Sequence, residues 1–182
     1  LQELDVQISP GEFVAFVGPS GSGKSTVFRL LLGFDSPSSG AVFFDGQDLC
    51  GLDARSVRQQ IGVVLQQGTL LPGDIFTNIV GSSSLTLDDA WAAARQAGLE
   101  EDIEALPMGM HTFIAEGGGN LSGGQLQRLL IARALAGKPR ILLFDEATSA
   151  LDNVTQEAVA RNLERINATR VVIAHRLSTV RK

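Results

Sequence analysis

A glycine-rich loop close to the start of the chain constrains the fold more than any other feature. Residues 18–25 read GPSGSGKS, and they follow the short apolar run FVAFV at residues 13–17. After the loop, apolar residues recur at helical spacing at Val27, Leu30 and Leu31. A buried strand, a glycine loop and a helix in this order are typical of a parallel α/β sheet, so we expect residues 13–17 to form a strand buried on both faces.

The alternation of strands and helices continues along the chain. The segment Asn153-Val-Thr-Gln156 can cap a helix between the last two predicted strands. This alternation predicts an α/β domain with a mainly parallel sheet flanked by helices, in which ligands bind beyond the carboxyl ends of the strands. The further apolar runs that predict strands lie at residues 40–44, 61–65, 140–144 and 169–174.

The middle of the chain is richer in helix formers. Residues 86–89 (TLDD) have the form of a capping box before an alanine-rich stretch, in which we expect Trp91 to pack in the core. Residues 100–106 offer a second short helix, and residues 107–120 read as a glycine-bearing loop. We therefore predict one domain over residues 1–182, with a core formed by residues 1–71 and 131–182 and a mostly helical insertion at residues 72–130.

Composition excludes several classes of function. With 182 residues, of which 44% are hydrophobic, the chain can bury a core of its own. The net charge is −5 and Lys/Arg runs are short, so we expect no nucleic-acid partner. No apolar run approaches the roughly 18–20 residues needed to cross a bilayer, so any membrane contact requires another domain or polypeptide. The single cysteine, Cys50, is expected to be a small buried hydrophobe.

The glycine loop has the composition of a phosphate-binding site. Its glycines let successive backbone N–H groups turn toward phosphate oxygens, and the following helix adds the positive end of its dipole. Lys24 is expected to neutralise the β- and γ-phosphates of a nucleotide, and Ser25 to ligate Mg²⁺. A glycine-rich turn that carries a lysine by chance is the alternative, and the strand–loop–helix context argues against it. The predicted nucleotide-binding residues here are Gly18, Pro19, Ser20, Gly21, Ser22, Gly23, Lys24, Ser25 and Thr26.

An acidic pair follows the apolar run at residues 140–144. Asp145 fits a carboxylate that holds Mg²⁺ through water, and Glu146 lies one residue further into the phosphate site. A carboxylate there can orient the attacking water and accept its proton, an effect on the order of 10²- to 10⁴-fold in rate. Helix N-capping is the alternative for the pair, and the presence of Lys24 favours the catalytic interpretation.

A second glycine-containing segment, LSGGQ at residues 121–125, precedes an apolar helical pattern that runs to Leu135. Its serine and glycines are expected at a helix N-terminus, where a hydroxyl and bare backbone N–H groups can bind an anion. We call each of these two predicted anion-binding segments a cradle: residues 18–25 form the first and residues 121–125 the second. One triphosphate rarely needs both cradles from one chain, so the second cradle is expected to come from another copy, placed head to tail. A capped helix after a glycine loop is the structural alternative.

Two more polar residues follow predicted strands. Gln66 follows the strand at residues 61–65, where its amide can reach Mg²⁺ or the attacking water, and His175 can hydrogen-bond the γ-phosphate. A lone histidine is more often structural, and we keep that interpretation for His111. The predicted catalytic residues are therefore Glu146, His175, Gln66 and Lys24, and the predicted metal ligands are Ser25, Gln66 and Asp145.

Together these residues closely resemble the nucleotide-binding domain of ATP-binding cassette (ABC) transporters, which has a P-loop NTPase core, and the likeness covers essentially the whole chain. The resemblance implies a Mg²⁺-dependent ATPase that closes as a head-to-tail dimer on two ATP molecules. Ser122, Gly124 and Asp152 then act on the partner copy's ATP, and Gly123 and Gln125 complete the nucleotide-binding set. The matching motifs are the Walker A loop at residues 18–25, the Q-loop glutamine Gln66, the signature at residues 121–125, Walker B at residues 141–145, the catalytic glutamate Glu146, the D-loop at residues 149–152 and the switch histidine His175.

Two segments narrow the resemblance to exporters. Residues 70–79 (LLPGDIFTNI) and 112–118 (TFIAEGG) are similar to exporter segments that lie against the coupling helices of a membrane domain. They favour a half-transporter, such as a bacteriocin or peptide exporter, with this domain at the cytoplasmic face of the membrane. The family's adenine-stacking aromatic normally lies further upstream than the 17 residues that precede Gly18. We therefore expect a domain truncated at both ends, with weak recognition of the base.

Other functions stay open at this point. A soluble ABC ATPase of translation or DNA repair uses the same motor, although the acidic charge and the exporter-like segments argue against it. A small-molecule kinase with a phosphate-binding loop has no use for residues 121–125. A fragment that binds nucleotide without turning it over is the remaining possibility.

Overall fold

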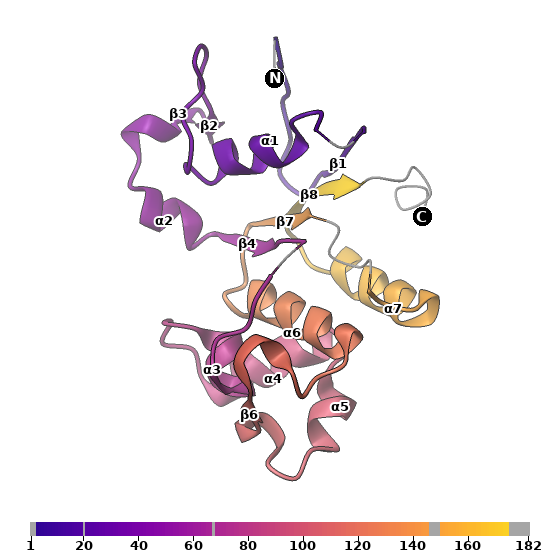
Figure 1. The fold of residues 1–182 in the computed structure, drawn as a ribbon. Coiled ribbons are helices and arrows are strands. Elements are labelled where there is room, and N and C mark those ends of the chain that lie inside the picture. The colour runs from indigo at the N-terminus through magenta and orange to yellow at the C-terminus, as the bar shows by residue number, and fades with distance from the viewer. Residues whose placement is uncertain (1–2, 20, 67, 146–149, 175–182) are drawn as a thin grey trace.

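The computed structural model describes residues 3–19, 21–66, 68–145 and 150–174. A parallel sheet lies between two layers of helices, and a lobe of helices is attached on one side (Figure 1). In these ranges no helix has the length and apolar content needed to cross a bilayer. The elements in chain order are β1 Phe13–Val17, α1 Lys24–Leu31, β2 Phe43–Phe44, β3 Gln47–Asp48, the 3₁₀ turn η1 Leu49–Gly51, α2 Ala54–Arg58, β4 Ile61–Val64, β5 Gly73–Asp74, α3 Ile75–Val80, α4 Leu87–Gln96, α5 Glu100–Glu104, η2 Gly109–His111, β6 Phe113–Ile114, η3 Glu116–Gly118, α6 Gly123–Ala136, β7 Ile141–Asp145, α7 Asn153–Glu164 and β8 Thr169–Ala174.

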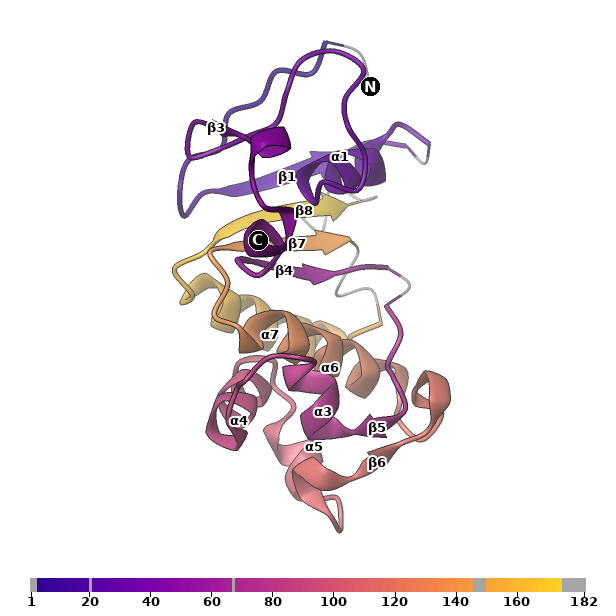
Figure 2. The same cartoon turned by 90° about the vertical axis from the view of Figure 1, so that its left-hand side faces the viewer.

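The central sheet has the strand order β1-β8-β7-β4, and every pairing in it is parallel. At its middle, Leu143 of β7 lies opposite Val171 of β8 and Val63 of β4. Because the strands run in the same direction, their carboxyl ends meet at one edge, to which the arrowheads point in Figure 2. The predicted α/β fold with a parallel sheet flanked by helices is confirmed.

Strand β1 differs from its prediction. In the described part of the chain it is an edge strand that pairs with β8 alone, and Phe13 and Val17 are 44% and 40% exposed. The prediction of a strand buried on both faces is therefore wrong. An apolar run identifies a strand, but the number of its neighbours depends on residues far away in the chain.

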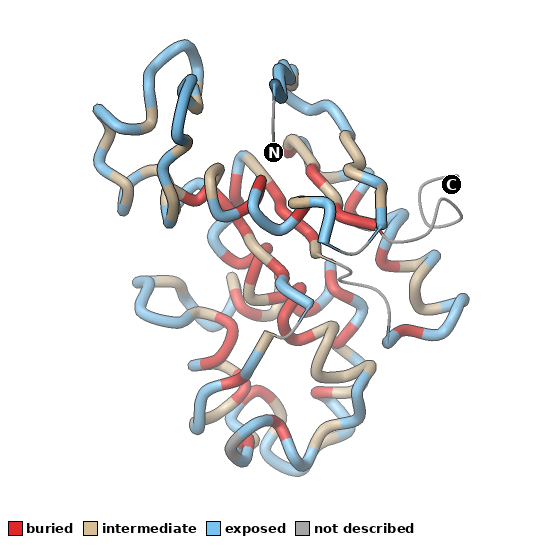
Figure 3. Tube along the Cα trace, turned by 45° about the horizontal axis from the view of Figure 1, so that its top comes forward, coloured by how far each residue is buried: buried red, intermediate tan, exposed pale blue. Residues whose placement is uncertain are grey.

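The two faces of the sheet pack against different helices. On one face, Phe28 and Leu32 at the end of α1 join Leu143, Val171 and Ile173 in one apolar cluster. Side chains alternate in direction along each strand, so the same strands also contribute apolar side chains to the opposite face. That face packs against α6 and α7. The residues of that second cluster include Leu142, Phe144, Leu129, Ile131 and Val159. Buried positions concentrate in these strands and helices, whereas the β2–β3 hairpin is largely exposed (Figure 3).

The lobe of α3, α4 and α5 packs against α6. Ala90, Ala93 and Ala94 of α4 are buried, and their small side chains let α4 approach α6 closely. The capping box is confirmed, since Thr86 Oγ1 accepts from Asp89 N at 3.3 Å and Asp89 accepts from Thr86 N at 3.1 Å. The backbone hydrogen bond from Thr86, followed by those from its hydroxyl and from Lys138, lowers the pKa of Asp89 to about 2.

Three further local predictions need correction. Residues 107–120 contain strand β6, which pairs antiparallel with β5, so this segment is more than a loop. Cys50 is exposed in η1 and is not a buried hydrophobe, because η1 follows directly on the exposed hairpin. Helix α7 is capped by Asp152 instead of Asn153, because the Asp152 carboxylate accepts hydrogen bonds from the N–H groups of Val154 and Thr155.

We predict that Gly62 in β4 is required for the packing of α6. A Cβ at this position would lie 2.3 Å from the carbonyl oxygen of Ala134 and 2.8 Å from Leu142 Cδ2, so the backbone would have to move. Gly62→Ala should lower the free energy of unfolding by about 1–3 kcal/mol, the usual range for overpacking. Urea unfolding measures this, with Gly51→Ala as the control because Gly51 has open space around it. Equal midpoints for the two variants would contradict the packing.

Candidate functional site

Residues 18–25 connect the carboxyl end of β1 to the first turn of α1. Gly21 and Gly23 have φ values of +81° and +90°, a left-handed conformation that suits glycine. Gly23 is the N-cap of α1 and offers no side chain to the N–H groups of the first turn. The N-terminus of α1 therefore presents backbone donors and a positive dipole end, as a phosphate site requires.

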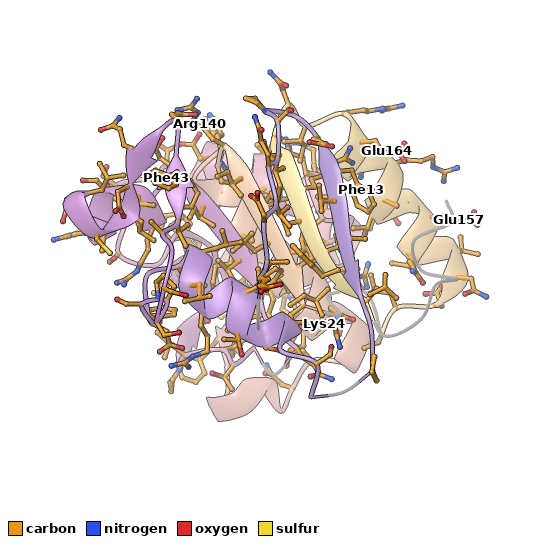
Figure 4. The ribbon with its side chains drawn as sticks, turned by 90° about the horizontal axis from the view of Figure 1, so that it is seen from above. Phe13, Lys24, Phe43, Arg140, Glu157 and Glu164 are labelled. Atoms are coloured by element: carbon orange, nitrogen blue, oxygen red, sulfur yellow. The ribbon has the colours of Figure 1, made fainter. Side chains whose placement is uncertain are left out.

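Lys24 carries the positive charge of this loop. The residue is only 9% exposed, and its ammonium donates to Gly18 O at 2.8 Å, Pro19 O at 2.7 Å and Ser22 Oγ at 3.3 Å. Figure 4 shows Lys24 at the edge of the sheet where β1 and β8 end. These acceptors are neutral, so a phosphate oxygen would give the ammonium a stronger, charge-assisted hydrogen bond.

Ser25 and Asp145 come together from distant parts of the sequence. Ser25 lies in the first turn of α1, Asp145 ends β7, and Ser25 Oγ donates to Asp145 Oδ2 at 3.5 Å. A hydroxyl and a carboxylate are hard oxygen ligands of the kind that Mg²⁺ binds together with water and phosphate oxygens. Within the described ranges, no cluster of three His, Cys, Asp or Glu side chains forms a complete metal site. The pair therefore fits a cation that takes most of its ligands from substrate and water.

The other residues predicted for the nucleotide site divide into those that the structure describes and those that it does not. Gln66 is exposed just beyond β4, and Thr26 is exposed on α1. Gln66 therefore lies at the same edge of the sheet as Asp145. Ser20, Glu146 and His175 lie outside the described residues, and their roles stay predictions from the sequence.

The second cradle lies at the N-terminus of α6, as predicted. Ser122 is the N-cap, its Oγ accepts from Gln125 N at 3.2 Å, and Gln125 Oε1 accepts from Ser122 N at 2.9 Å. Gly123 and Gly124 belong to the first turn, so their N–H groups have no acceptor within the helix. Ser122 and Gly123 are exposed, which leaves these donors accessible to an anion.

Asp102 on α5 fixes the orientation of this helix start. Its carboxylate accepts from Gln125 Nε2 at 2.9 Å and pairs with Arg128 Nη1 at 2.7 Å. Arg128 also donates to Gly98 O at 2.6 Å. The sequence analysis missed Asp102, although Gln125 and Arg128 lie three residues apart on one helix face and indicate a common acidic partner.

In the part of the chain that the structure describes, the two cradles are not linked to each other. Among the described residues, no hydrogen bond or ion pair links residues 18–25 to residues 121–125. Asp152 is the N-cap of α7, and its hydrogen bonds with Thr155, first that of the hydroxyl, lower its pKa. The described residues thus present two separate helix N-termini, at α1 and α6, with backbone N–H donors.

His111 has the structural role predicted for it. Its Nδ1 lies 3.0 Å from Asp74 Oδ2, and Asp74 is the N-cap of α3. Burial favours the neutral form of Asp74, but hydrogen bonds from Thr77 and His111 outweigh it and lower the pKa of Asp74.

A partly buried polar bridge that the sequence analysis missed ties α6 to the segment after Gln66. Arg133 donates to Asn78 O at 2.7 Å, Asn78 Oδ1 at 2.6 Å and Thr69 O at 3.1 Å. Asn78 in turn exchanges hydrogen bonds with the backbone of Leu71, at 3.1 and 2.9 Å. The signal was present, because a polar residue inside the apolar run IFTNIV and a cation inside ARALA each need buried partners.

The parallel sheet and its glycine loop define a nucleotide-binding domain of the P-loop NTPase class. The family model described as "ABC transporter" matches residues 1–149. The chain therefore belongs to the ABC transporter family.

Relatives resemble the chain over its whole length. It is 47% identical over 184 residues to the alpha-hemolysin translocation ATP-binding protein HlyB of Escherichia coli O157:H7. It is also 47% identical over 185 residues to the exotoxin translocation ATP-binding protein PaxB of Pasteurella aerogenes. Both alignments cover 100% of this chain and 26% of the relative, so the chain spans about a quarter of their length. A bacterial Atm1-family ABC exporter solved with ATP bound has a TM-score of 0.91 at 42% identity, over 95% of this chain and 31% of that one.

We predict that Lys24→Met weakens nucleotide binding. Loss of a charged hydrogen bond costs about 1.5–3 kcal/mol, so the Kd for ATP should rise about 10- to 100-fold. Lys138→Met is the control, because Lys138 pairs with Asp89 at the surface and its side chain is 78% exposed. Equilibrium binding of a fluorescent ATP analogue measures both. A Lys24→Met protein with the affinity of the control would show that the loop does not hold the phosphates.

Proposed function

We propose that this chain is the ATP-hydrolysing motor domain of an ABC exporter. The observation that carries the proposal is the meeting of Lys24, Ser25 and Asp145 at the carboxyl edge of the parallel sheet. That arrangement supplies a cation for phosphates and hard oxygens for Mg²⁺ at one point. Membership in the ABC transporter family and the likeness to exporter proteins support the transport role.

Within one copy, each residue has a distinct task. Lys24 and the backbone N–H groups of its loop hold the β- and γ-phosphates of ATP. Ser25, Asp145 and Gln66 hold Mg²⁺, which when bound neutralises phosphate charge. Glu146 orients the attacking water and accepts its proton. His175 hydrogen-bonds the γ-phosphate.

The second copy completes the site. Ser122, Gly123 and Gly124 of one copy present a hydroxyl and free N–H groups to the triphosphate held by the other copy's glycine loop. Because no hydrogen bond or ion pair between described residues links the two cradles of one copy, the head-to-tail arrangement can use both surfaces of each copy. ATP binding then closes the dimer, and hydrolysis around Glu146 reopens it.

An exposed apolar surface beside the Q-loop suits a membrane-domain partner. Leu71 and Phe113 are 69% and 63% exposed, and they lie on the segments that lead into and form the β5–β6 ladder. Arg133 and Asn78 hold the Leu71 backbone against α6. In this proposal, a displacement of Gln66 is passed to the exposed apolar surface and, through Arg133 and Asn78, to helix α6, which begins with the second cradle.

The relatives support a proposal for the cargo and the location of this chain. The names of HlyB and PaxB describe translocation of alpha-hemolysin and of an exotoxin, so we propose a peptide or protein cargo for this chain. The domain then lies at the cytoplasmic face of a membrane, attached to membrane-spanning helices of the same polypeptide or complex. The net charge of −5 and these relatives disfavour the alternative, a soluble ABC ATPase of translation or DNA repair. Six hydrophobic spans encoded upstream of Leu1 would match the exporter, and none would match the alternative.

We predict that Glu146→Gln retains ATP but loses turnover. The amide keeps the size of the side chain and cannot accept the proton of water, so the ATPase rate should fall about 10²- to 10⁴-fold while ATP affinity changes little. The variant should accumulate as an ATP-bound dimer in size-exclusion chromatography. Glu164→Gln, at the exposed last residue of helix α7, is the control. Unchanged hydrolysis in Glu146→Gln would remove Glu146 as the base.

A further inference from the structure

Gln127 reaches from the signature helix to the segment that precedes α7. It lies in the second turn of α6, and its Oε1 accepts a hydrogen bond from Ala150 N at 2.8 Å. Ala150 stands two residues before Asp152, the N-cap of α7. A side chain of α6 thus holds the backbone of residues 150–152.

The same segment packs closely on the start of α6. A Cβ at Gly124 would lie 3.8 Å from Ala150 O and from Leu151 Cδ2, and one at Gly123 would lie 4.0 Å from Ala150 Cβ. Leu151 is 9% exposed and belongs to the same apolar cluster as Leu129. Residues 150 and 151 therefore lie next to the glycines of the second cradle, at a distance at which a Cβ would make ordinary contact.

Both ends of this contact are fixed locally. Ser122 is locked to Gln125 by the reciprocal cap of α6. The Asp152 carboxylate accepts from Val154 N and Thr155 N, each at 3.0 Å, and from Thr155 Oγ1 at 2.6 Å. The two caps do not fix the position of Ser122 relative to Asp152. The hydrogen bond between Gln127 and Ala150 restrains that relative position, because it joins α6 to the segment that ends at Asp152.

We propose that Gln127 is a positioning residue that sets Ser122 and Asp152 in register, so that both meet the partner copy's triphosphate in one closure step. The inference rests on the proposed function, since it needs a site shared by two copies. Through its hydrogen bond with Ala150 N, Gln127 is expected to act on the nucleotide to which its own copy offers Ser122.

Mixed dimers separate this role from a general effect on folding. A dimer of one Lys24→Met copy and one Ser122→Arg copy, isolated with two affinity tags on the full-length protein, has one intact shared site. That site combines the Ser122→Arg copy's glycine loop with the Lys24→Met copy's Ser122. Gln127→Leu, which keeps the bulk and removes the acceptor, can then be placed in either copy.

In the Lys24→Met copy, Gln127→Leu should lower kcat about tenfold with little change in KM, the scale of one lost hydrogen bond. In the Ser122→Arg copy, where the neighbouring cradle is already disabled, the same substitution should change kcat less than twofold. Gln127→Glu in the Lys24→Met copy should restore kcat to within about threefold, because a carboxylate oxygen accepts from Ala150 N. Asn162→Leu is the control, since it removes a similar bond, from Asn162 Nδ2 to Gln96 O at 3.1 Å, between α7 and α4.

Each result of the mixed-dimer experiment supports or contradicts the positioning role of Gln127. Equal losses from Gln127→Leu in both placements, or no loss in either, would overturn the positioning role, and so would failure of Gln127→Glu to restore kcat. Absence of turnover in the mixed dimer before any change at Gln127 would instead overturn the shared site, and with it the proposed function.

Discussion

The packing of helix α6 against the parallel sheet is the contact on which the rest of the structure depends. Gly62 lets the backbone of α6 approach β4 at Ala134, and Ile131 and Ala132 are fully buried between the sheet and the helical lobe. The same helix begins at Ser122 with the second cradle. The position of α6 therefore determines where the second cradle lies relative to the carboxyl edge of the sheet. It also determines where Arg133 holds the segment after Gln66 and where Gln127 holds residues 150–152.

The N-termini of α1 and α6 both favour anions, but they do so with different chemical groups. α1 has a glycine cap and a buried lysine, so it offers a full positive charge together with backbone donors. α6 has a serine cap with free N–H groups behind it, so it offers partial charge and a hydroxyl. The first suits the strongly charged β- and γ-phosphates, and the second suits a group that must bind and release once per cycle. Under the proposed function, a second cradle that binds more weakly allows the dimer to close and reopen.

The sequence predicted the features that depend on neighbouring residues. The strand, loop and helix around Lys24, and the caps at Thr86 and Ser122, are encoded within a few residues of each other. Four wrong or missing predictions depend on distant contacts: the exposed edge at Phe13, the β5–β6 pairing, and the partners of Asp102 and of Gln127. Asp152 lies between these cases, because both it and Asn153 can cap a helix, and only the backbone geometry decides which one does. A site is therefore readable as motifs, whereas the side chains that hold the motifs in place require the fold.

The central claim is that one triphosphate lies between the glycine cradles of two copies. An experimental structure of the ATP-bound Glu146→Gln dimer tests it most directly. The account predicts that Lys24 of one copy and Ser122 of the other lie within hydrogen-bonding distance of the same γ-phosphate. A structure in which Ser122 of the same copy, or of neither copy, contacts that phosphate would contradict it.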